Sequence, residues 1–405
     1  MEGAVTRESG ELRKERSWRE GHAKTVTFIV TEDCQLRCKY CYIVGKNKKH
    51  KMDFEVARAT IDYLLRDRRQ FDDESIIFDF IGGEPLIEMD LIDRICDYAK
   101  LRMFELDHPW FDNYRFSFST NGLLYGKEKV QRYIAKNRDH VSIGISIDGT
   151  KRKHNAQRIF PNGKGSYDEV VKNIPLWLRQ FPGASTKATV AHDDLPYIKD
   201  SVAHLFKLGI NTVNINVVFE DVWHPGDDDL LEDQLRQLAD YMIDNGLHKD
   251  HECSFFTKLI GKPLRKGDDR NWCGSGKMLA VDGDGNFYPC VRFAPYSLSH
   301  RAARCIGNCY DGIDRNKLRP FLAMTRATQS TEECTKCDVA TGCAWCSGYN
   351  YDASKTGTIF QRATFICKMH KARVRANNYY WAKLEKVGSG RQKRVGNTRS
   401  TTRAN

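Results

Sequence analysis

Three closely spaced cysteines mark the first place where this sequence could carry out chemistry. Cys34, Cys38 and Cys41 form a C-x3-C-x2-C run directly after the apolar, β-branched segment 25–31. Structural zinc normally takes four protein ligands, whereas a cubane iron–sulfur cluster held by three thiolates keeps one iron open. The run therefore predicts an iron–sulfur cluster whose open iron binds a ligand. The alternatives are incidental cysteines or a zinc site completed by His50.

A second group of cysteines lies in the last third of the chain. Its members are Cys273, Cys290, Cys334, Cys337, Cys343, Cys346 and Cys367. Seven thiols are too many for one four-ligand site. The C-x2-C-x5-C-x2-C part alone would suit a zinc ribbon, but the upstream cysteine run favours two further iron–sulfur clusters. Cys253, Cys305 and Cys309 are candidates for an additional ligand, and Cys96 is expected to be a buried free thiol.

Composition excludes several classes of protein. The chain has 405 residues, 40% of them hydrophobic, and a mean hydropathy of −0.58. No stretch approaches the roughly 20 apolar residues of a membrane helix, and the first residues are too charged for a secretory signal. Fourteen cysteines in a large cytosolic chain are not expected to form disulfides. We expect a soluble, cytoplasmic protein with no membrane partner.

The net charge would suggest a nucleic-acid partner, but its excess is concentrated at the end of the chain. The formal charge is +11, and six Lys and Arg residues with no acidic residue follow Glu385. Segments of this composition are typically solvated and disordered. We therefore expect residues 386–405 to form a basic disordered tail, and we expect no nucleic-acid partner.

Strand-like and helical segments alternate through the first two thirds of the chain. The strand-like runs are 25–31, 75–81, 114–119, 141–147, 186–190 and 212–218. Segments with apolar residues at helical spacing are 54–69, 91–106, 170–181 and 198–208. This alternation predicts an α/β fold, a partial (β/α)6 TIM-like barrel in residues 25–250. A small cysteine-rich domain would occupy residues 251–385, and residues 1–24 would be an N-terminal extension.

Polar and glycine-containing turns follow three of these strands. In chain order they contain Gly82, Gly83 and Glu84, then Ser119 and Asn121, then Ser146. Paired glycines let a ligand approach the backbone, and Glu84 can accept hydrogen bonds from an ammonium group. In parallel α/β folds, ligands collect at the carboxyl ends of the strands. We expect these residues to face one cavity.

The cysteine run with Tyr40 before its last cysteine, the GGEP turn and the SIDG segment together resemble radical S-adenosylmethionine (SAM) enzymes. The later cysteines resemble their SPASM extension, so that the likeness covers roughly residues 25–372. It implies that the first three cysteines hold a [4Fe-4S] cluster whose open iron binds SAM. An electron from a donor such as flavodoxin or ferredoxin would then split SAM and yield a 5′-deoxyadenosyl radical. The implied cofactor contacts are Tyr40, Gly82, Gly83, Glu84, Ser119, Asn121, Ser146 and Arg158.

The resemblance also divides the later cysteines between two auxiliary [4Fe-4S] clusters. The distal cluster would be held by Cys334, Cys337, Cys343 and Cys367. The proximal cluster would be held by Cys273, Cys290 and Cys346, with a fourth ligand from Cys253, Cys305, Cys309 or the substrate. The family core usually has three residues between its last two cysteines, where this chain has Ala344 and Trp345.

Within the family, the stretches CGSGKMLAVDGDGNFYPCVRF and CIGNCYDGID resemble the maturases of CXXX-repeat peptides, whose products are ranthipeptides. This likeness implies thioether formation in a ribosomally synthesised precursor peptide with repeated Cys motifs. The alternative is anaerobic sulfatase maturation, in which Cys or Ser is oxidised to formylglycine. Those maturases generally have an acid after the cysteine that aligns with Cys290, where this chain has Val291 and Arg292. A zinc-binding structural protein and a nucleic-acid-modifying radical enzyme are alternatives of other classes.

Overall fold

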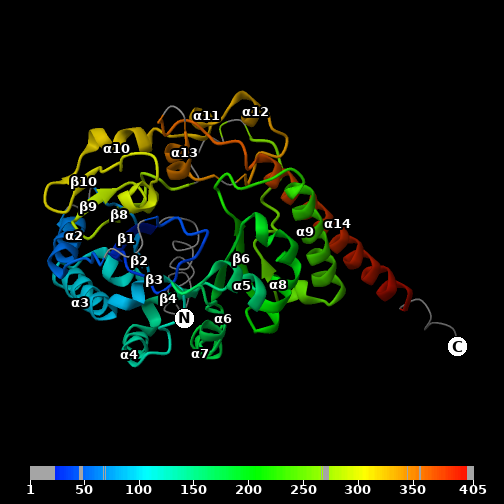
Figure 1. Ribbon diagram of the computed structural model, residues 1–405, viewed down its shortest axis with the longest axis horizontal. Coiled ribbons are helices and arrows are strands. Elements are labelled where there is room, and N and C mark those ends of the chain that lie inside the picture. Colours follow the sequence, from blue (N-terminus) through cyan, green and yellow to red (C-terminus); the bar gives the residue numbers. More distant parts are fainter. Residues whose placement is uncertain are drawn as a thin grey trace, which may run out of the picture.

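The structure is a computed structural model that describes most of the chain. It covers residues 23–398 apart from 45–48, 67, 69, 266, 268–272, 344, 355 and 356, with side chains up to residue 387. Strands and helices alternate in the first two thirds, and short elements that carry the second group of cysteines follow (Figure 1). The predicted α/β fold with a cysteine-rich C-terminal region is confirmed.

A curved, parallel sheet forms the centre of the fold. Its first half consists of β1 (Ala23–Thr31), β2 (Ser75–Gly82), β3 (Tyr114–Thr120) and β4 (Val141–Ile145). Its second half consists of β5 (Ser185–Val190), β6 (Thr212–Val217) and the short β7 (Glu252–Cys253). A bridge between Ser146 and Lys187 joins the two halves. The six predicted strands therefore follow one another in chain order.

The cysteine-rich region extends this sheet on the other side of β1. There β8 (Leu279–Val281) pairs in parallel with β1, and the antiparallel strands that follow are β9 (Asn286–Tyr288), β10 (Gly307–Asn308) and β11 (Gly312–Ile313). The α-helices of this region that precede Cys367 are α10 (Arg315–Leu322), α11 (Arg326–Gln329), α12 (Glu332–Thr335) and α13 (Ser347–Ala353). Pairing with β1 holds this region against the barrel.

Helices cover the outer face of the sheet. They are α2 (Phe54–Arg66), α3 (Met89–Glu105), α4 (Glu128–Lys136), α5 (Lys151–Gln157), α6 (Tyr167–Val171), α7 (Ile174–Gln180), α8 (Ile198–Lys207) and α9 (Asp227–Asp244). The single helix predicted at 170–181 is wrong. The segment forms α6 and α7, because Pro175 lies in the first turn of α7 and its ring would clash inside a continuous helix.

The two faces of the sheet differ in chemistry because strand side chains alternate. Val26, Phe28 and Val30 of β1 are fully buried on one face, within the main apolar core under the helices. On the other face, Thr27 donates a hydrogen bond of 3.3 Å to Asp79 of β2. Burial raises the pKa of Asp79. The barrel therefore has an apolar outer layer and a partly polar interior.

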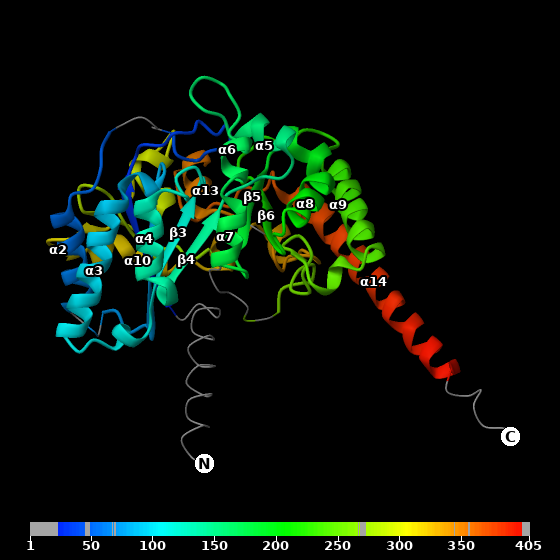
Figure 2. The same cartoon turned by 90° about the horizontal axis from the view of Figure 1, so that it is seen from below.

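The last helix corrects the predicted boundary of the tail. Figure 2 shows α8, α9 and α14 (Cys367–Thr398) side by side at one end of the molecule. Tyr379 donates to Asp240 of α9 at 2.7 Å, and Lys383 pairs with the same carboxylate at 2.7 Å. Helix α14 runs on to Thr398, past residue 386, where the predicted tail begins. Residues 399–405 and 1–22 lie outside the described residues. No helix in the described part is long and apolar enough to span a membrane.

Candidate active site

The three cysteines of the first run lie on a loop that follows β1 and is fixed by backbone contacts. Arg37 N donates to Ile159 O at 2.7 Å, and Lys39 N donates to Gln157 O at 3.0 Å. The thiol of Cys34 is buried, and those of Cys38 and Cys41 are half-buried. None of the fourteen cysteines, all of which lie in the described residues, forms a disulfide. The loop therefore presents three thiols without a disulfide among them.

The glycine pair after β2 is required by the approach of this cysteine loop. Gly83 N donates to Thr31 O at 2.9 Å. A Cβ atom on Gly83 would lie 2.1 Å from Asp33 O, and one on Gly82 would lie 2.2 Å from Thr31 O. The sequence predicted that a ligand would approach these glycines. In the structure, the backbone that leads to Cys34 already does so.

Glu84 is a buried carboxylate that joins the ends of β2 and β3. It is 1% exposed and accepts hydrogen bonds from Leu86 N at 3.1 Å, Thr120 Oγ1 at 2.6 Å and Asn121 N at 2.7 Å. Burial raises its pKa, although these donors oppose the change. Glu84 is thus engaged by the protein itself, and its contact with the SAM amine stays a prediction.

The other predicted contacts differ in how closely they approach the cysteine loop. Asn121 Nδ2 lies 3.1 Å from Gln35 Oε1 and 3.9 Å from Cys34 Sγ. Ser119 is exposed on β3, and Ser146 is half-buried at the end of β4. The structure therefore brings Asn121 to the first cysteine and leaves the two serines on the sheet, where their roles stay predictions.

The Tyr40 hydroxyl connects Arg158 to Asp148, a residue that is not among the predicted cofactor contacts. The Tyr40 hydroxyl donates to Asp148 Oδ2 at 2.6 Å and accepts from Arg158 Nη1 at 2.9 Å. Burial opposes a rise in the pKa of Arg158, but the interactions with Tyr40, Cys38 and Asp148 outweigh it. Asp148 belongs to the SIDG turn after β4, and this position at a strand end was its signal in the sequence.

The later cysteines form two groups in the structure. Burial, followed by the charges of Cys346 and Cys273, raises the pKa of Cys290 to about 12. Burial also raises the pKa of Cys343, and the next charges acting in this direction are those of Cys367, Cys334 and Cys337. The division of these cysteines between two clusters stays a prediction.

The three candidate additional ligands have other partners. Cys253 is buried, and its charged neighbour is Arg373 of α14. Cys305 Sγ lies 3.2 Å from Gly307 O, and Cys309 contacts Thr60 of α2. Cys96 is a buried free thiol, as expected, 3.2 Å from the hydroxyl of Tyr133.

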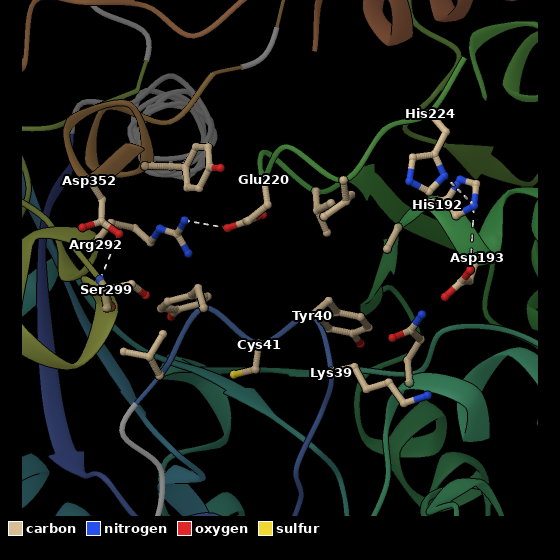
Figure 3. Close-up of a pocket in the computed structure, with 18 residues that line it drawn as sticks. Lys39, Tyr40, Cys41, His192, Asp193, Glu220, His224, Arg292, Ser299 and Asp352 are labelled. Carbon is tan, nitrogen blue, oxygen red and sulfur yellow. Dashed lines mark hydrogen bonds and ion pairs between the residues drawn. The ribbon is translucent and has the colours of Figure 1, made fainter. Parts of the chain in front are cut away.

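A cavity of about 570 Å³ lies between the cysteine loop and the C-terminal region (Figure 3). Its lining includes Tyr40, Cys41, His192, Asp193, Glu220, His224, Arg292 and Tyr349. Arg292 donates to Glu220 at 2.8 Å, and its guanidinium lies 4.8 Å from the ring centre of Tyr42. His192, Glu220 and His224 are not among the predicted site residues, although they follow the predicted fifth and sixth strands.

Comparisons with known proteins agree with this architecture. Residues 28–195 match the family model of the Radical SAM superfamily. An uncharacterized protein of Methanocaldococcus jannaschii is 29% identical over 301 residues, 73% of this chain and 91% of its own length. The antilisterial bacteriocin subtilosin biosynthesis protein AlbA of Bacillus subtilis is 24% identical over 335 residues, 79% of this chain and 66% of its own.

A solved structure shows the same fold. It is native anSMEcpe with bound AdoMet and Cp18Cys peptide, with a TM-score of 0.66 and 18% identity, covering 91% of this chain and 99% of that one. At this identity the likeness concerns the fold alone. Together with the family match, it shows that residues 28–195 of this chain form a radical SAM domain.

Proposed function

We propose that this protein is a radical SAM peptide maturase that joins Cys sulfur to carbon in a ribosomally synthesised precursor peptide. One observation carries the proposal: the cavity is bounded by Tyr40 and Cys41 on one side and by Arg292 and Tyr349 of the cysteine-rich region on the other. A substrate in it would lie between the first cysteine run and the cysteine-rich region. The similarity to AlbA, a bacteriocin biosynthesis protein, and to a structure with a bound peptide supports a peptide substrate.

The donor atoms at the first site fit the proposed cofactors. Cys34, Cys38 and Cys41 offer three thiols on one loop that are not joined in a disulfide, which leaves one iron of a [4Fe-4S] cluster for SAM. When bound, cluster and SAM supply a 5′-deoxyadenosyl radical that removes hydrogen from the substrate. The residues proposed to hold SAM are Tyr40, Gly82, Gly83, Glu84, Ser119, Asn121, Ser146 and Arg158. A flavodoxin or ferredoxin is the proposed electron donor.

The cysteine-rich region would hold two auxiliary [4Fe-4S] clusters. The group of Cys334, Cys337, Cys343 and Cys367 supplies four thiols, whereas the group of Cys273, Cys290 and Cys346 supplies three. We propose that a thiolate of the precursor is the fourth ligand of the smaller group, with Cys253, Cys305 and Cys309 as the alternatives within the chain. A thiolate bound to iron is already deprotonated and needs no strong base.

The cavity wall can hold and orient a peptide. Arg292 is 13% exposed and remains charged, since Cys346 and Glu220 raise its pKa against the effect of burial. Its planar group lies over Tyr42, which burial keeps neutral by raising the pKa of the phenol. A fixed guanidinium of this kind can bind a carboxylate or backbone carbonyls of a substrate. We propose that Arg292 positions the precursor.

The test is an anaerobic reaction of the reconstituted enzyme with reductant, SAM and a Cys-repeat precursor. Thioether formation lowers the peptide mass by about two units per linked cysteine, and the linked sulfur resists both reduction and alkylation. The Cys34→Ala variant should cleave no SAM and leave the peptide unchanged. If the wild type cleaved SAM but left the peptide unchanged, the proposed radical chemistry would stand. The proposed class of substrate would be wrong.

Formylglycine formation is the second candidate, because the cavity contains a carboxylate that the sequence did not place there. Glu220 lies beside Arg292 and is 32% exposed, so it could accept a proton from a substrate Cys or Ser. In that case, a sulfatase-type peptide would gain an aldehyde that hydrazines label. The Glu220→Gln variant would then retain SAM cleavage and lose most of the aldehyde product.

A further inference from the structure

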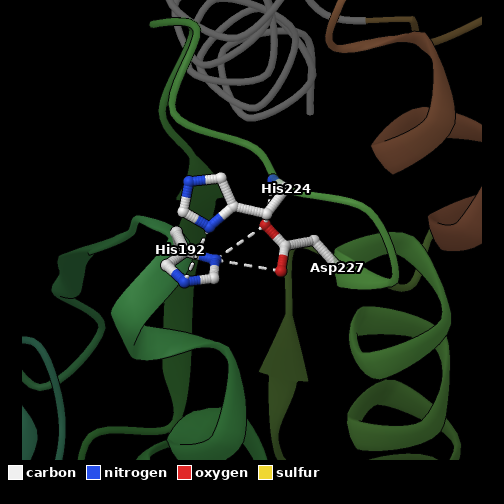
Figure 4. A group of neighbouring side chains, drawn as sticks. All are labelled: His192, His224 and Asp227. Carbon is white, nitrogen blue, oxygen red and sulfur yellow. Dashed lines mark hydrogen bonds and ion pairs between the residues drawn. The ribbon is translucent and has the colours of Figure 1, made fainter.

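Two histidines and an aspartate from two separate segments meet at one edge of the cavity (Figure 4). His192 follows β5, His224 follows β6, and Asp227 is the first residue of α9. His192 Nε2 lies 3.0 Å from His224 Nδ1. On the other edge of the His192 ring, Nδ1 lies 2.9 and 2.8 Å from the two carboxylate oxygens of Asp227.

We propose that His192 and His224 bind a divalent metal ion of the zinc class. Zinc binds imidazole nitrogens at about 2.0–2.1 Å, so two such ligands at tetrahedral or right angles lie roughly 2.8–3.4 Å apart. The observed distance of 3.0 Å between His192 Nε2 and His224 Nδ1 falls in this range. The ring centres lie 4.0 Å apart, so the two rings would have to turn away from each other for both nitrogens to face an ion seated beside the pair.

Asp227 is placed to orient the His192 ligand. A metal-binding histidine commonly donates its other ring N–H to a carboxylate, which fixes the ring and increases its basicity. Asp227 accepts from Nδ1 of His192 and also from the backbone N of His224 at 2.8 Å. It is 5% exposed, so both contacts are held at the buried start of α9. One carboxylate thus positions both histidines.

The cavity side offers a further ligand and open positions. Asp193 Oδ1 lies 3.9 Å from His192 Nε2, and its side chain is 84% exposed and free to turn toward an ion. Both histidines and Asp193 line the cavity (Figure 3). Zinc ions with three protein ligands keep a position for water or substrate. An ion here would offer that position to a thiolate or carboxylate in the cavity.

The test measures metal content and needs no peptide, so its outcome is independent of the proposed function. The cluster-reconstituted protein is treated anaerobically with one equivalent of Zn²⁺, desalted, and analysed for zinc, iron and sulfide. The wild type should retain about one zinc per chain more than the His192→Ala and His224→Ala variants. Equal iron and sulfide in all three would show that the clusters and the fold are intact. The matched control is His248→Ala, which changes a half-buried histidine on another segment.

The identity of the ligands and the role of Asp227 provide two further readouts. Zinc-edge X-ray absorption should show nitrogen and oxygen ligands near 2.0–2.1 Å, with imidazole scattering, and no sulfur near 2.3 Å. Asp227→Asn should weaken zinc binding by roughly 10- to 100-fold while iron is unchanged. Equal zinc in wild type and both histidine variants, or zinc bound by sulfur, would overturn the proposal. The contacts among these residues would then be a hydrogen-bonded chain without an ion.

Discussion

The Tyr40 hydroxyl donates a hydrogen bond of 2.6 Å to Asp148, and this contact joins the cysteine loop to the end of β4. Arg158 donates to the same hydroxyl at 2.9 Å, so the phenol bridges a buried acid and a buried base. Burial is the main reason that the pKa of Tyr40 is raised, which keeps the hydroxyl protonated and able to donate. The position of the loop between Cys38 and Cys41 therefore depends on this bridge.

Replacing Tyr40 with Phe should destabilise the fold. The ring is retained, but Asp148 and Arg158 each lose a partner in a buried setting, which typically costs about 1–3 kcal/mol in the free energy of unfolding. Anaerobic chemical denaturation would measure the loss. The control is Tyr379→Phe, which removes a hydrogen bond to the half-exposed Asp240 and should cost less. Equal losses in both variants would contradict a special role for the Tyr40 bridge.

Replacing Gly83 with Ala should displace the cysteine loop. The new Cβ would lie 2.1 Å from Asp33 O, a backbone atom that cannot move without the loop. Overpacking of this kind costs about 1–3 kcal/mol, and we expect the variant to bind less iron at the first site. Gly183→Ala is the control, because a Cβ there meets no atom within 4 Å. Iron content and denaturation midpoints would be compared, and wild-type values for Gly83→Ala would refute the steric argument.

Local patterns in the sequence predict the layers of this fold and the cysteine groups. Apolar, β-branched runs predict the positions of β1 to β6. Because strands and helices alternate, few topologies other than a parallel sheet are possible. Pro175 indicates that segment 170–181 is divided between two helices, but the spacing of apolar residues alone does not show this division. The limits of α14 depend on Asp240 of α9, which no local pattern contains.

The candidate site is less predictable because its contacts join distant segments. Tyr40 and Asp148 are 108 residues apart, and His192 and Asp227 are 35 apart. A strand end predicts that a polar residue faces the cavity, but not which other strand end it meets. Glu84 illustrates the same limit, since its donors Thr120 and Asn121 come from the next strand.

A buried histidine should make stability depend on pH. His154 is fully buried and accepts at Nδ1 from Asp148 N, while Nε2 lies 3.0 Å from Ser166 Oγ. The Ser166 hydroxyl donates to Arg158 O, so Nε2 must carry the ring proton and His154 is neutral. Burial lowers its pKa from 6.5 to about 3. Between these values the unfolded chain binds a proton that the folded chain does not, so stability falls as pH falls below about 6.5.

The His154→Gln variant should lose this pH dependence. One proton contributes up to about 1.4 kcal/mol per pH unit to the free energy of unfolding. Denaturation at about pH 7 and about pH 5.5 should therefore show a smaller difference in the variant than in the wild type. His248→Gln, a half-buried histidine near the end of α9, should retain the wild-type slope. If the dependence of stability on pH were the same in His154→Gln and in the wild type, folding would not lower the pKa of this histidine.

The two groups of later cysteines should lose iron independently. Cys290 interacts with Cys346 and Cys273, whereas Cys343 interacts with Cys367, Cys334 and Cys337. If each group holds one [4Fe-4S] cluster, Cys290→Ala and Cys343→Ala should each lose up to about four irons per chain, and the double variant should lose the sum. The reason is that a cluster deprived of a thiolate becomes labile, while the other group keeps its own ligands.

The control for this experiment is Cys253→Ala, because that buried thiol interacts with Arg373 and belongs to neither group. It should retain the full iron and sulfide content. Loss of a cluster in Cys253→Ala would make Cys253 the missing fourth ligand of the Cys273, Cys290 and Cys346 group. The position proposed for a substrate thiolate would then be filled by the protein. Full retention in Cys253→Ala, Cys305→Ala and Cys309→Ala, combined with the loss in Cys290→Ala, leaves the three-thiol group open to a ligand from the peptide.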